Sequence, residues 1–573
     1  MAKDMKGIAT SDGIGIAPAY LLVDPDLSYD KVKVDDTAAE YARVKKAFQD
    51  SIEELTQIKE NAKDRLGEEE LGVFDAHIAI LSDPEMLGQI KDNIENNHTG
   101  AEEAVDKVTT AFADMLAAMT DNAYMQERAA DVKDVAKRAM SHLLGKQVLN
   151  IAGINSPVVI VAHEITPSDT SQMDAKFVKG IVTDLGGRTS HAAIMSRTLR
   201  IPAIVGSNEI TTSVEHGQMM IVDGLNGDAI IDPSDDQVKE YEAKAEAFEA
   251  ERAEWAKLVD APSVSKDGKE FEIAANIGTP DDTEDAVKQG ADGVGLFRSE
   301  FLYMDNDHMP SEDEQFEAYK KAVVGMNGKP VVVRTMDIGG DKPLDYMPLP
   351  KEENPFLGYR AIRICLDRPE LFKTQLRALV RASEFGPVSI MFPMIATVAE
   401  LRQAKAIFEE AKAEVQKDHP GLGDDVKIGM MIEIPLAALN AAQLAKEVDF
   451  FSIGTNDLIQ YSFAADRGNE AVSYLYQPLN PAFLSLVKHV ITSAHENGAK
   501  AAMCGEMAGD EMALPLLMGM GLDEYSMSAT SILRTRSMMK KLDTKEWAGY
   551  VDEIIANCAT VEEVQDFVKS KLG

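Results

Sequence analysis

The feature that most restricts the fold is an alternation of strand-like and helical segments after about residue 262. Short apolar runs such as 331–333 and 450–453 are typical of parallel strands that are buried on both faces. The strand-like segments end near eight positions, namely Asn276, Arg298, Arg334, Met394, Glu433, Asp457, Cys504 and Ser526. Eight strand–helix units in roughly 300 residues predict a (β/α)8 TIM barrel over residues 262–573.

The residues before the barrel indicate two units of different character. Apolar strand-like segments recur between 156 and 224, which predicts a compact α/β domain. From about 35 to 144 nearly every stretch has helical period, and four amphipathic stretches predict a bundle of four helices. If the glycine-containing segment at the N-terminus supplies a strand of the α/β domain, the bundle is an insertion in that domain.

Residues 233–260 are almost entirely charged or alanine, without a broad apolar face. Such a helix most simply bridges two domains. The predicted fold is therefore a multidomain α/β protein in which a swivelling α/β domain with an inserted bundle precedes the barrel. The predicted boundaries are 1–25 plus 145–230 for the α/β domain, 26–144 for the bundle, 231–261 for the linker and 262–573 for the barrel.

Composition excludes several classes of protein. The net charge of −38 argues against nucleic-acid binding, which requires a basic surface. The first ten residues lack a secretory signal, and no stretch has the roughly 20 apolar residues of a membrane helix. The three cysteines are far apart and form neither a disulfide framework nor a zinc site. We expect a cytoplasmic protein.

Charged side chains follow several predicted barrel strands at their C-terminal ends, where TIM barrels have their active sites. Arg298, Arg334 and Arg467 offer forked donors that suit carboxylate and phosphate groups. Glu433 and Asp457 are hard oxygen ligands, enough to anchor Mg²⁺ while leaving positions for water and substrate. Taken singly, these residues are equally compatible with salt bridges or caps at the barrel rim.

Two uncharged residues extend this inventory. Asn456 can donate to a phosphate oxygen, and Cys504 is a possible proton donor or acceptor. A buried inert thiol is the alternative for Cys504. The set as a whole predicts a site for a small, doubly anionic substrate that requires Mg²⁺.

A histidine motif lies at 183–195. Gly186 and Gly187 allow a tight left-handed turn, and Ser190 is a natural N-cap for the helical pattern that follows. His191 then falls in the first helical turn, where free N–H groups favour an anion such as a phosphate carried on the ring. Arg188 and Thr189 can add donors. The alternative is a structural histidine that caps its own turn.

The segment 186–191 resembles the phosphohistidine signature of the phosphoenolpyruvate–protein phosphotransferase family, Enzyme I of the bacterial sugar phosphotransferase system. The resemblance extends in order and spacing over essentially the whole chain. It is carried by the segments 127–132, 295–302, 334–342, 354–360, 454–458, 466–469 and 504–510.

The resemblance implies a role for each matching residue. His191 would be the phosphorylated nucleophile, Cys504 would protonate the enolate of the departing pyruvate, and Glu433 and Asp457 would hold Mg²⁺. Phosphoenolpyruvate would be bound by Arg298, Arg334, Arg360, Asn456, Asp457 and Arg467. The inserted bundle would dock the phosphocarrier protein HPr, and the barrel domain would form a homodimer.

Some residues depart from the family pattern, and other functions remain open. Ala192 stands where Ser or Thr is usual, Ser299 and Ile459 stand where Thr is commoner, and 75–77 reads Asp-Ala-His in place of Glu-Gly-His. An acidic face near His77 would meet a basic carrier; it comprises Glu68, Glu69, Glu70, Asp75, Asp83 and Glu85. Pyruvate phosphate dikinase or phosphoenolpyruvate synthase, a regulatory phosphorelay paralogue and a pyruvate lyase or aldolase are the alternatives.

Overall fold

The computed structural model describes residues 3–23, 25–62, 68–117, 123–146, 151–165, 169, 173–187, 190–304, 306–340, 342, 344 and 346–572. The chain divides into two compact units, Met1–Phe248 and Glu249–Gly573. No helix within the described ranges has both the length and the apolar character that a membrane span requires.

The first unit contains an eight-stranded sheet in the order β1-β8-β7-β3-β4-β5-β6-β2. Its strands are β1 (Lys3–Lys6), β2 (Ile8–Ser11), β3 (Ile14–Leu22), β4 (Val158–Ala162), β5 (Val178–Thr183), β6 (Ala203–Val205), β7 (Met219–Asp223) and β8 (Asp228–Ile231). The N-terminal segment therefore supplies strands to the α/β domain. Strands β3 and β4 pair with each other, so the helices that lie between them in the chain form an insertion in this domain.

A single residue, Gly7, separates the two strands that form opposite edges of this sheet. Its N–H donates to the carbonyl of Gly227 at 3.0 Å. A β-carbon on Gly7 would lie 2.5 Å from Ile204 Cγ2 and 2.8 Å from the Val205 carbonyl oxygen. The chain can therefore run from one edge of the sheet to the other only because glycine has no side chain here.

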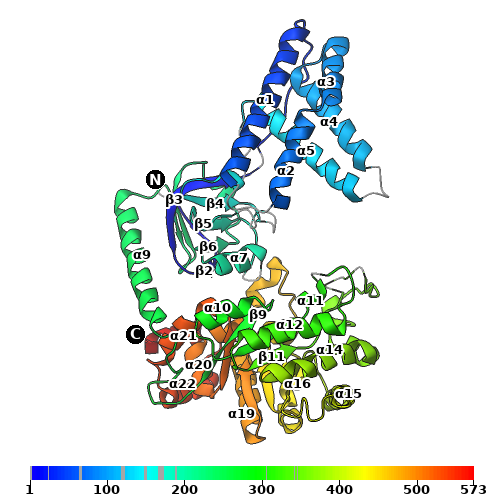
Figure 1. Cartoon of the computed structure of the whole chain (residues 1–573). Helices are drawn as coiled ribbons and strands as arrows, with labels where there is room; N and C mark the ends of the chain where they lie inside the picture. The colour runs from blue at the N-terminus through cyan, green and yellow to red at the C-terminus, as the bar shows by residue number, and fades with distance from the viewer. Residues whose placement is uncertain are drawn as a thin grey trace. The chain divides into compact units, whose positions relative to one another are not determined.

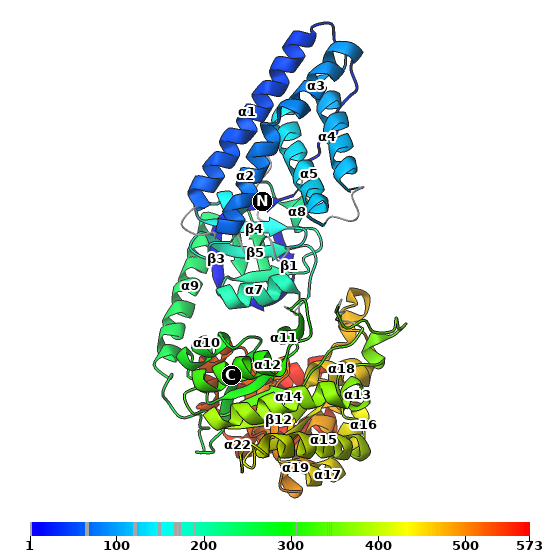
Figure 2. The same ribbon diagram turned by 45° about the vertical axis from the view of Figure 1, so that its right-hand side comes forward.

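The inserted bundle contains five helices among the described residues, so the prediction of four was wrong. They are α1 (Thr37–Ala62), α2 (Glu68–Leu81), α3 (Pro84–Asn97), α4 (Ala101–Ala117) and α5 (Ala123–Leu143). The missed helix is α3, where Asp83 accepts hydrogen bonds from the N–H groups of Glu85 and Met86 and caps its start. Neighbouring helices pack side by side around one apolar core (Figure 2).

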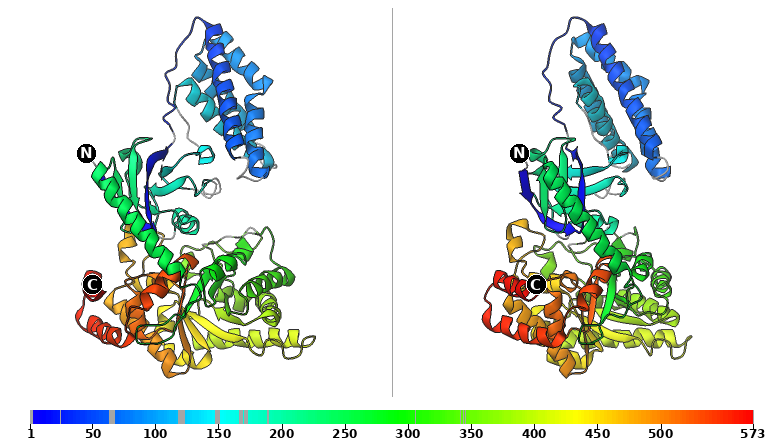
Figure 3. Two further views of the ribbon diagram at one scale, coloured as in Figure 1. Left: turned by 60° about the vertical axis from the view of Figure 1, so that its left-hand side comes forward. Right: turned by 90° about the vertical axis from the view of Figure 1, so that its left-hand side faces the viewer.

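Three further α-helices lie among the described residues of the first part of the chain. They are α7 (His191–Leu199), α8 (Ile210–Ser213) and α9 (Asp235–Ala256). The last is one uninterrupted helix within the predicted linker (Figure 3). Among its described side chains only Phe248 is buried, which agrees with the absence of an apolar stripe in its sequence.

The second unit is built on a closed barrel of parallel strands, which confirms the predicted TIM barrel. The strands are β9 (Glu272–Ile277), β10 (Val294–Arg298), β11 (Val331–Arg334), β12 (Val388–Phe392), β13 (Lys427–Ile432), β14 (Phe450–Ile453), β15 (Lys500–Met503) and β16 (Glu524–Met527). Strand β14 ends earlier than predicted, because the chain turns into a helix before it reaches Asp457.

Helices cover the outside of the barrel (Figure 1). They are α10 (Asp282–Lys288), α11 (Phe301–Met304), α12 (Glu312–Gly325), α13 (Ile362–Asp367), α14 (Pro369–Ala382), α15 (Val398–Gln416), α16 (Pro435–Leu439), α17 (Ala441–Leu444), α18 (Thr455–Phe463), α19 (Pro481–Glu496), α20 (Leu514–Met520), α21 (Ile532–Met539), α22 (Thr544–Asn557) and α23 (Val561–Leu572).

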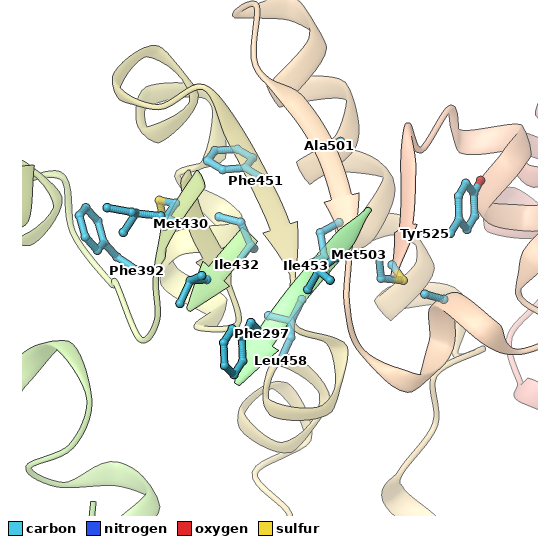
Figure 4. Packing of buried hydrophobic residues seen from close by; sticks show 14 of the residues in the cluster. Phe297, Phe392, Met430, Ile432, Phe451, Ile453, Leu458, Ala501, Met503 and Tyr525 are labelled. Carbon is cyan, nitrogen blue, oxygen red and sulfur yellow. The ribbon is translucent and has the colours of Figure 1, made fainter. Parts of the chain in front are cut away.

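Side chains of the barrel strands alternate between two apolar clusters. Those that pack against the helices include Phe297, Met430, Ile432, Phe451 and Ile453 (Figure 4). The residues that alternate with them along the strands form a separate cluster inside the barrel, which comprises Leu296, Val332, Met391, Met431, Phe450 and Cys504. Since successive side chains of a strand point to opposite faces, this alternation fixes which polar residues at the strand ends face the interior.

Candidate active site

The alternation within the strands turns four predicted site residues toward the barrel axis. Arg298 and Arg334 are the last residues of β10 and β11, two positions beyond Leu296 and Val332, whose side chains fill the interior. Glu433 directly follows β13, and Cys504 directly follows β15. The structure therefore brings these four residues together at the C-terminal end of the barrel, where the sequence placed them.

Arg334 is the centre of a buried network of charges. Its Nη2 donates to Glu300 Oε1 at 2.5 Å, and its Nη1 lies 3.0 Å from Asp337 Oδ2. These two carboxylates raise the pKa of Arg334 despite its burial. Lys342 Nζ reaches the same Glu300 oxygen at 3.4 Å. The guanidinium is thus fixed in orientation. Because Nη1 also donates to Met431 Sδ at 3.8 Å, the second hydrogen of Nη2 is the one available to a substrate oxygen.

Asp337 also holds a second arginine. Its Oδ1 accepts from Nη2 of the buried Arg360 at 2.9 Å, and the neighbouring cations keep the pKa of the Asp337 carboxyl well below its usual range. Ala361, the next residue, has a φ of 51° and a ψ of −126°, a strained conformation for a residue with a β-carbon. The backbone strain therefore lies next to the arginine that the network orients.

Within the described part of the chain no ion pair joins Arg298 to a carboxylate, whereas Arg334 and Arg360 each pair with Asp337. The Nε of Arg298 is buried without a hydrogen-bond partner in the described structure, and its guanidinium lies 4.9 Å from the centre of the Phe301 ring. Burial lowers the pKa of Arg298 from its ordinary value. A half-buried cation without a counter-charge among the described residues favours an anionic ligand.

Glu433 and Asp457 form a pair of buried carboxylates. Glu433 Oε1 accepts the N–H of Met394 at 2.5 Å, whereas Glu433 Oε2 has no partner among the described residues. Burial, and then the charges of Asp457 and Asp337, raises the pKa of Glu433 to about 8. Such a pair needs a cation between or beside its oxygens, so the residues fit a hard divalent ion such as Mg²⁺.

No group of three or more His, Cys, Asp or Glu side chains in the described ranges is arranged to hold a metal ion. Among side chains of these types, Glu433 and Asp457 are therefore the two that would ligate Mg²⁺ at this position. Its remaining coordination positions would belong to water and to substrate oxygens, as is usual for Mg²⁺ in phosphoryl-transfer sites.

Asn456 and Arg467 belong to helix α18 and to the segment that follows it. Asn456 lies in the first turn of α18, and its Oδ1 accepts from the Tyr476 hydroxyl at 2.8 Å. Because its oxygen is engaged, the amide nitrogen of Asn456 is the group available to a ligand. Arg467 Nη1 lies 3.6 Å from Asp457 Oδ1, and its side chain is partly exposed.

The thiol of Cys504 is buried and stays protonated, because burial raises its pKa to about 12. The Cys504 carbonyl accepts from Asn276 Nδ2 at 3.0 Å, and Ser526 Oγ in turn donates to Asn276 Oδ1 at 2.6 Å. These two hydrogen bonds connect the ends of β15, β16 and β9. A protonated thiol in a fixed position is suited to donate a proton rather than to attack.

The histidine motif lies in the first unit. Its turn begins at Gly186, whose φ is 112°. Ser190 Oγ accepts from the N–H of Ala193 at 3.4 Å and caps α7, so His191 is the first residue of a helix, as predicted. The side chain of His191, and all of Arg188 and Thr189, lie outside the described part of the structure.

The acidic face predicted on the bundle is only partly available. Asp83 caps α3, so its carboxylate is used locally. Asp75 Oδ1 pairs with Lys59 Nζ at 2.6 Å, and His77 Nε2 lies 3.4 Å from Asp131 Oδ1. The side chains of Glu68, Glu69 and Glu70 lie outside the described residues.

The sequence indicated no role for several residues of the barrel site. Glu300, Asp337 and Lys342 stand within the segments 295–302 and 334–342 that carry the family resemblance, but they follow the strands at irregular intervals, so strand periodicity does not place them. The sequence pattern predicts that Asn276 ends a strand, but it assigns this residue no function. The available signal was a polar residue at the end of an apolar strand, and it applies to Asn276 as it does to Arg298.

Three family models match consecutive parts of the chain. Residues 6–128 match the N-terminal domain of PEP-utilising enzymes, residues 154–227 match their mobile domain, and residues 252–544 match their PEP-binding domain. The last match contains the whole of the barrel site described above.

Whole relatives are similar over nearly their full length. A phosphoenolpyruvate-protein phosphotransferase of Latilactobacillus sakei is 57% identical over 99% of this chain and 100% of its own. Those of Enterococcus faecalis and Bacillus subtilis are 57% and 55% identical over 98% and 99% of both chains. The chain belongs to the phosphoenolpyruvate-protein phosphotransferase family.

Proposed function

We propose that the chain transfers the phosphoryl group of phosphoenolpyruvate to His191, releases pyruvate, and passes the phosphoryl group to a histidine of the phosphocarrier protein HPr. This is the first step of the sugar phosphotransferase system. The observation that carries the proposal is the cluster of buried arginines that faces two carboxylates and a protonated thiol at the end of the barrel.

Phosphoenolpyruvate would be held by the cationic side chains of this cluster. The residues proposed to bind it are Arg298, Arg334, Arg360, Asn456, Asp457 and Arg467. The Nε of Arg298 has no hydrogen-bond partner among the described residues, and Arg334 is preoriented by Glu300 and Asp337. Preoriented donors in a buried site stabilise the charge of a transferring phosphoryl group without reorganising at the moment of reaction.

Mg²⁺ would be held by Glu433 and Asp457. The ion would offset negative charge on the phosphate and on the enolate oxygen. The raised pKa of Glu433 supports this assignment, because the carboxylate pair is unfavourable until a cation compensates it.

Cys504 would donate its proton to the carbon of the enolate that remains after the phosphoryl group has left. The protonated state of its thiol supports this role. His191 would act as a neutral nucleophile, since the N-terminus of α7 disfavours a positive imidazolium and favours the phosphate that the ring would carry.

The proposed division of labour follows the predicted boundaries. The α/β domain over 1–25 and 145–230 would carry the phosphohistidine, the bundle over 26–144 would dock HPr, and the helical linker over 231–261 would let the histidine domain swivel. One histidine that serves two partners requires such a mobile domain. The reaction would take place in the cytoplasm.

We further propose a homodimer that forms through the barrel domain. Four large apolar side chains are exposed on segments that follow barrel strands, namely Leu357, Leu436, Leu439 and Tyr474. Exposed apolar side chains that lie together on one surface are typical of interfaces, and we propose that these four form such a face. Leu439→Glu, compared with the exposed Val324→Glu on α12, would shift the protein toward monomer in sedimentation if this face is the interface.

The proposed reaction is tested by intact mass after incubation with phosphoenolpyruvate and Mg²⁺, without ATP. We expect one acid-labile phosphate that is located on His191, is absent from His191→Ala and is lost when HPr is added. No gain in mass without ATP would overturn the proposal and favour a dikinase-like or regulatory protein. A phosphate that persists in His191→Ala would place the nucleophile elsewhere.

A further inference from the structure

Gln375 is a buried amide of α14 to which the proposed mechanism assigns no role. Its Oε1 accepts from the N–H of Met336 at 2.9 Å, and its Nε2 donates to Ser299 Oγ at 3.0 Å and to the Tyr319 hydroxyl at 2.9 Å. All four residues are fully buried. One side chain of the helical layer therefore joins the segments that follow two neighbouring barrel strands, β10 and β11.

Ser299 continues the pairing of these two strands beyond their ends. The last register pair of β10 and β11 is Arg298 with Arg334. One residue further along β10, Ser299 Oγ donates to the Arg334 carbonyl at 2.6 Å. A side-chain hydrogen bond thus takes over where the backbone ladder stops, and it fixes the spacing of the two peptide segments from which both arginine side chains start.

The donors and acceptors of this network fix its direction. A backbone N–H can only donate, so the amide oxygen of Gln375 faces Met336 and its two N–H groups face Ser299 and Tyr319. The Arg334 carbonyl can only accept, so the Ser299 hydroxyl points to it. A buried network in which every such group has its partner holds its members in one arrangement.

The amide of Gln375 is in turn held by the helices outside the barrel. The Tyr319 hydroxyl donates to Gln315 Oε1 at 3.2 Å, and Gln315 Nε2 donates to the Pro310 carbonyl at 3.0 Å. The hydroxyl of Tyr303 reaches the same Gln315 oxygen at 3.1 Å. The network therefore ties the ends of β10 and β11 to α11 and α12.

We propose that Gln375 and Ser299 are positioning residues for phosphoenolpyruvate: they hold the ends of β10 and β11 so that the guanidinium groups of Arg298 and Arg334 meet the substrate together. Arg298 depends on this support most, because no ion pair in the described part of the chain orients it. A misplacement of about 1 Å in a binding site costs up to about a hundredfold in rate. The inference rests on the proposed function, since it needs both arginines to bind phosphoenolpyruvate.

The test measures the Kd of phosphoenolpyruvate with Mg²⁺ by calorimetry, in full-length protein that carries His191→Ala so that no phosphoryl group is transferred. Ser299→Ala should raise the Kd roughly tenfold, because the two arginines lose their fixed spacing. Ser299→Thr, which keeps the hydroxyl, should restore most of the affinity.

Ser263→Ala is the matched control. Ser263 is also a buried serine of the barrel unit with two hydrogen bonds, since its Oγ donates to Asp292 Oδ2 at 3.1 Å and accepts from Arg536 Nε at 3.0 Å. It precedes β9 and lies outside the proposed site. Ser263→Ala and Ser299→Ala should both lower the melting temperature, but Ser263→Ala should leave the Kd unchanged.

Two further variants address Gln375 itself. Gln375→Met removes both hydrogen bonds of the amide nitrogen and should weaken binding at least as much as Ser299→Ala. Tyr319→Phe is milder, because it removes one partner of Gln375 without touching a strand end, and should weaken binding by a smaller factor. It keeps the test decisive if the first two variants do not fold.

Kinetics with His191 restored separate positioning from a general loss of folding. At limiting phosphoenolpyruvate, Ser299→Ala and Tyr319→Phe should be phosphorylated more slowly than the wild type. Once phosphorylated, they should pass the phosphoryl group to HPr at the wild-type rate, since that step does not use the barrel site. A protein that is merely less well folded would be slow in both steps.

The outcomes distinguish this inference from the proposed function. An unchanged Kd in Tyr319→Phe and Ser299→Ala, or an equal loss of affinity in Ser263→Ala, would overturn the inference while the wild type still forms its phosphoprotein. A wild type that forms no phosphoprotein would overturn the proposed function and this inference with it.

Discussion

Glu300 and Arg334 form a buried ion pair in which 2.5 Å separates Glu300 Oε1 from Arg334 Nη2. Glu300 is 3% exposed and Arg334 7%. The other Glu300 oxygen has no hydrogen-bond partner among the described residues. The ion pair therefore fixes the position of Arg334, while one oxygen of Glu300 stays without a hydrogen-bond donor. From this we expect the stability of the ligand-free enzyme and of the ligand-bound enzyme to respond differently to substitution of Glu300.

Glu300→Gln should destabilise the ligand-free enzyme by about 2 kcal/mol, because Arg334 loses one of its two buried counter-charges. Phosphoenolpyruvate supplies negative charge to the same guanidinium, so it should raise the melting temperature of the variant more than that of the wild type. Thermal unfolding with and without ligand measures both effects. Glu312→Gln removes partners of Arg377 and Arg381 outside the site and should show no enhanced response.

Glu433→Gln should lower phosphoryl transfer at least about a hundredfold, because a neutral amide replaces one of the two carboxylates proposed to hold Mg²⁺. It should also abolish the stabilisation that Mg²⁺ gives in the presence of phosphoenolpyruvate, measured as a shift in melting temperature. Glu410→Gln, on the exposed face of α15, serves as the matched control. A variant that keeps the Mg²⁺ response would exclude Glu433 as a ligand.

Ser190→Ala should lower the free energy of unfolding of the first unit by about 1 kcal/mol, because the N–H of Ala193 loses its capping acceptor. Ser190→Thr keeps the cap and should restore most of the loss. Denaturant unfolding followed by circular dichroism measures both variants. Equal stability of the wild type and Ser190→Ala would show that the cap contributes nothing to α7.

Arg536→Lys should destabilise the barrel unit by about 3 kcal/mol or more, because the fully buried guanidinium holds the start of the barrel chain in place. It donates to Ser263 Oγ and to the carbonyl oxygens of Leu258, Val259 and Gly290 at 2.6–3.0 Å. A lysine ammonium cannot reach four acceptors in this fork.

The same substitution at an exposed position gives the control for that prediction. Arg402→Lys affects an exposed pair with Glu447 and should change stability by less than about 0.5 kcal/mol. Chemical denaturation of the two variants side by side measures the difference. If both variants lose the same free energy of unfolding, the hydrogen bonds of the buried Arg536 guanidinium contribute nothing beyond its charge.

Much of the barrel and of its site was predictable because one local rule covers it. Apolar runs that alternate with helical segments predict a TIM barrel, and polar residues directly after such runs fall at the catalytic end. Arg298, Arg334, Glu433 and Cys504 follow this rule. Asn456 and Asp457 follow it only in part, since they belong to the first turn of α18 rather than to a strand.

In the bundle, the same reasoning from sequence periodicity fails to predict helix α3. Residues 84–97 carry Gly88, Asp92 and three asparagines, all of which have low helix propensity. Asp83 as N-cap, Pro84 in the first turn and burial of Met86, Ile90 and Ile94 nonetheless give a helix. Tertiary packing supplies what local propensity lacks.

The sequence by itself determined the barrel, the order of the domains and the residue types at the strand ends, because these depend on periodicities within single segments. Only the tertiary structure decided which side chains share one small volume. The pairing of Glu300 with Arg334, of Asp337 with Arg360 and of Asn276 with the Cys504 carbonyl depends on how the ends of the barrel strands pack against one another. Interactions of that kind act over a few ångströms between segments far apart in the chain, and no local pattern encodes their distance.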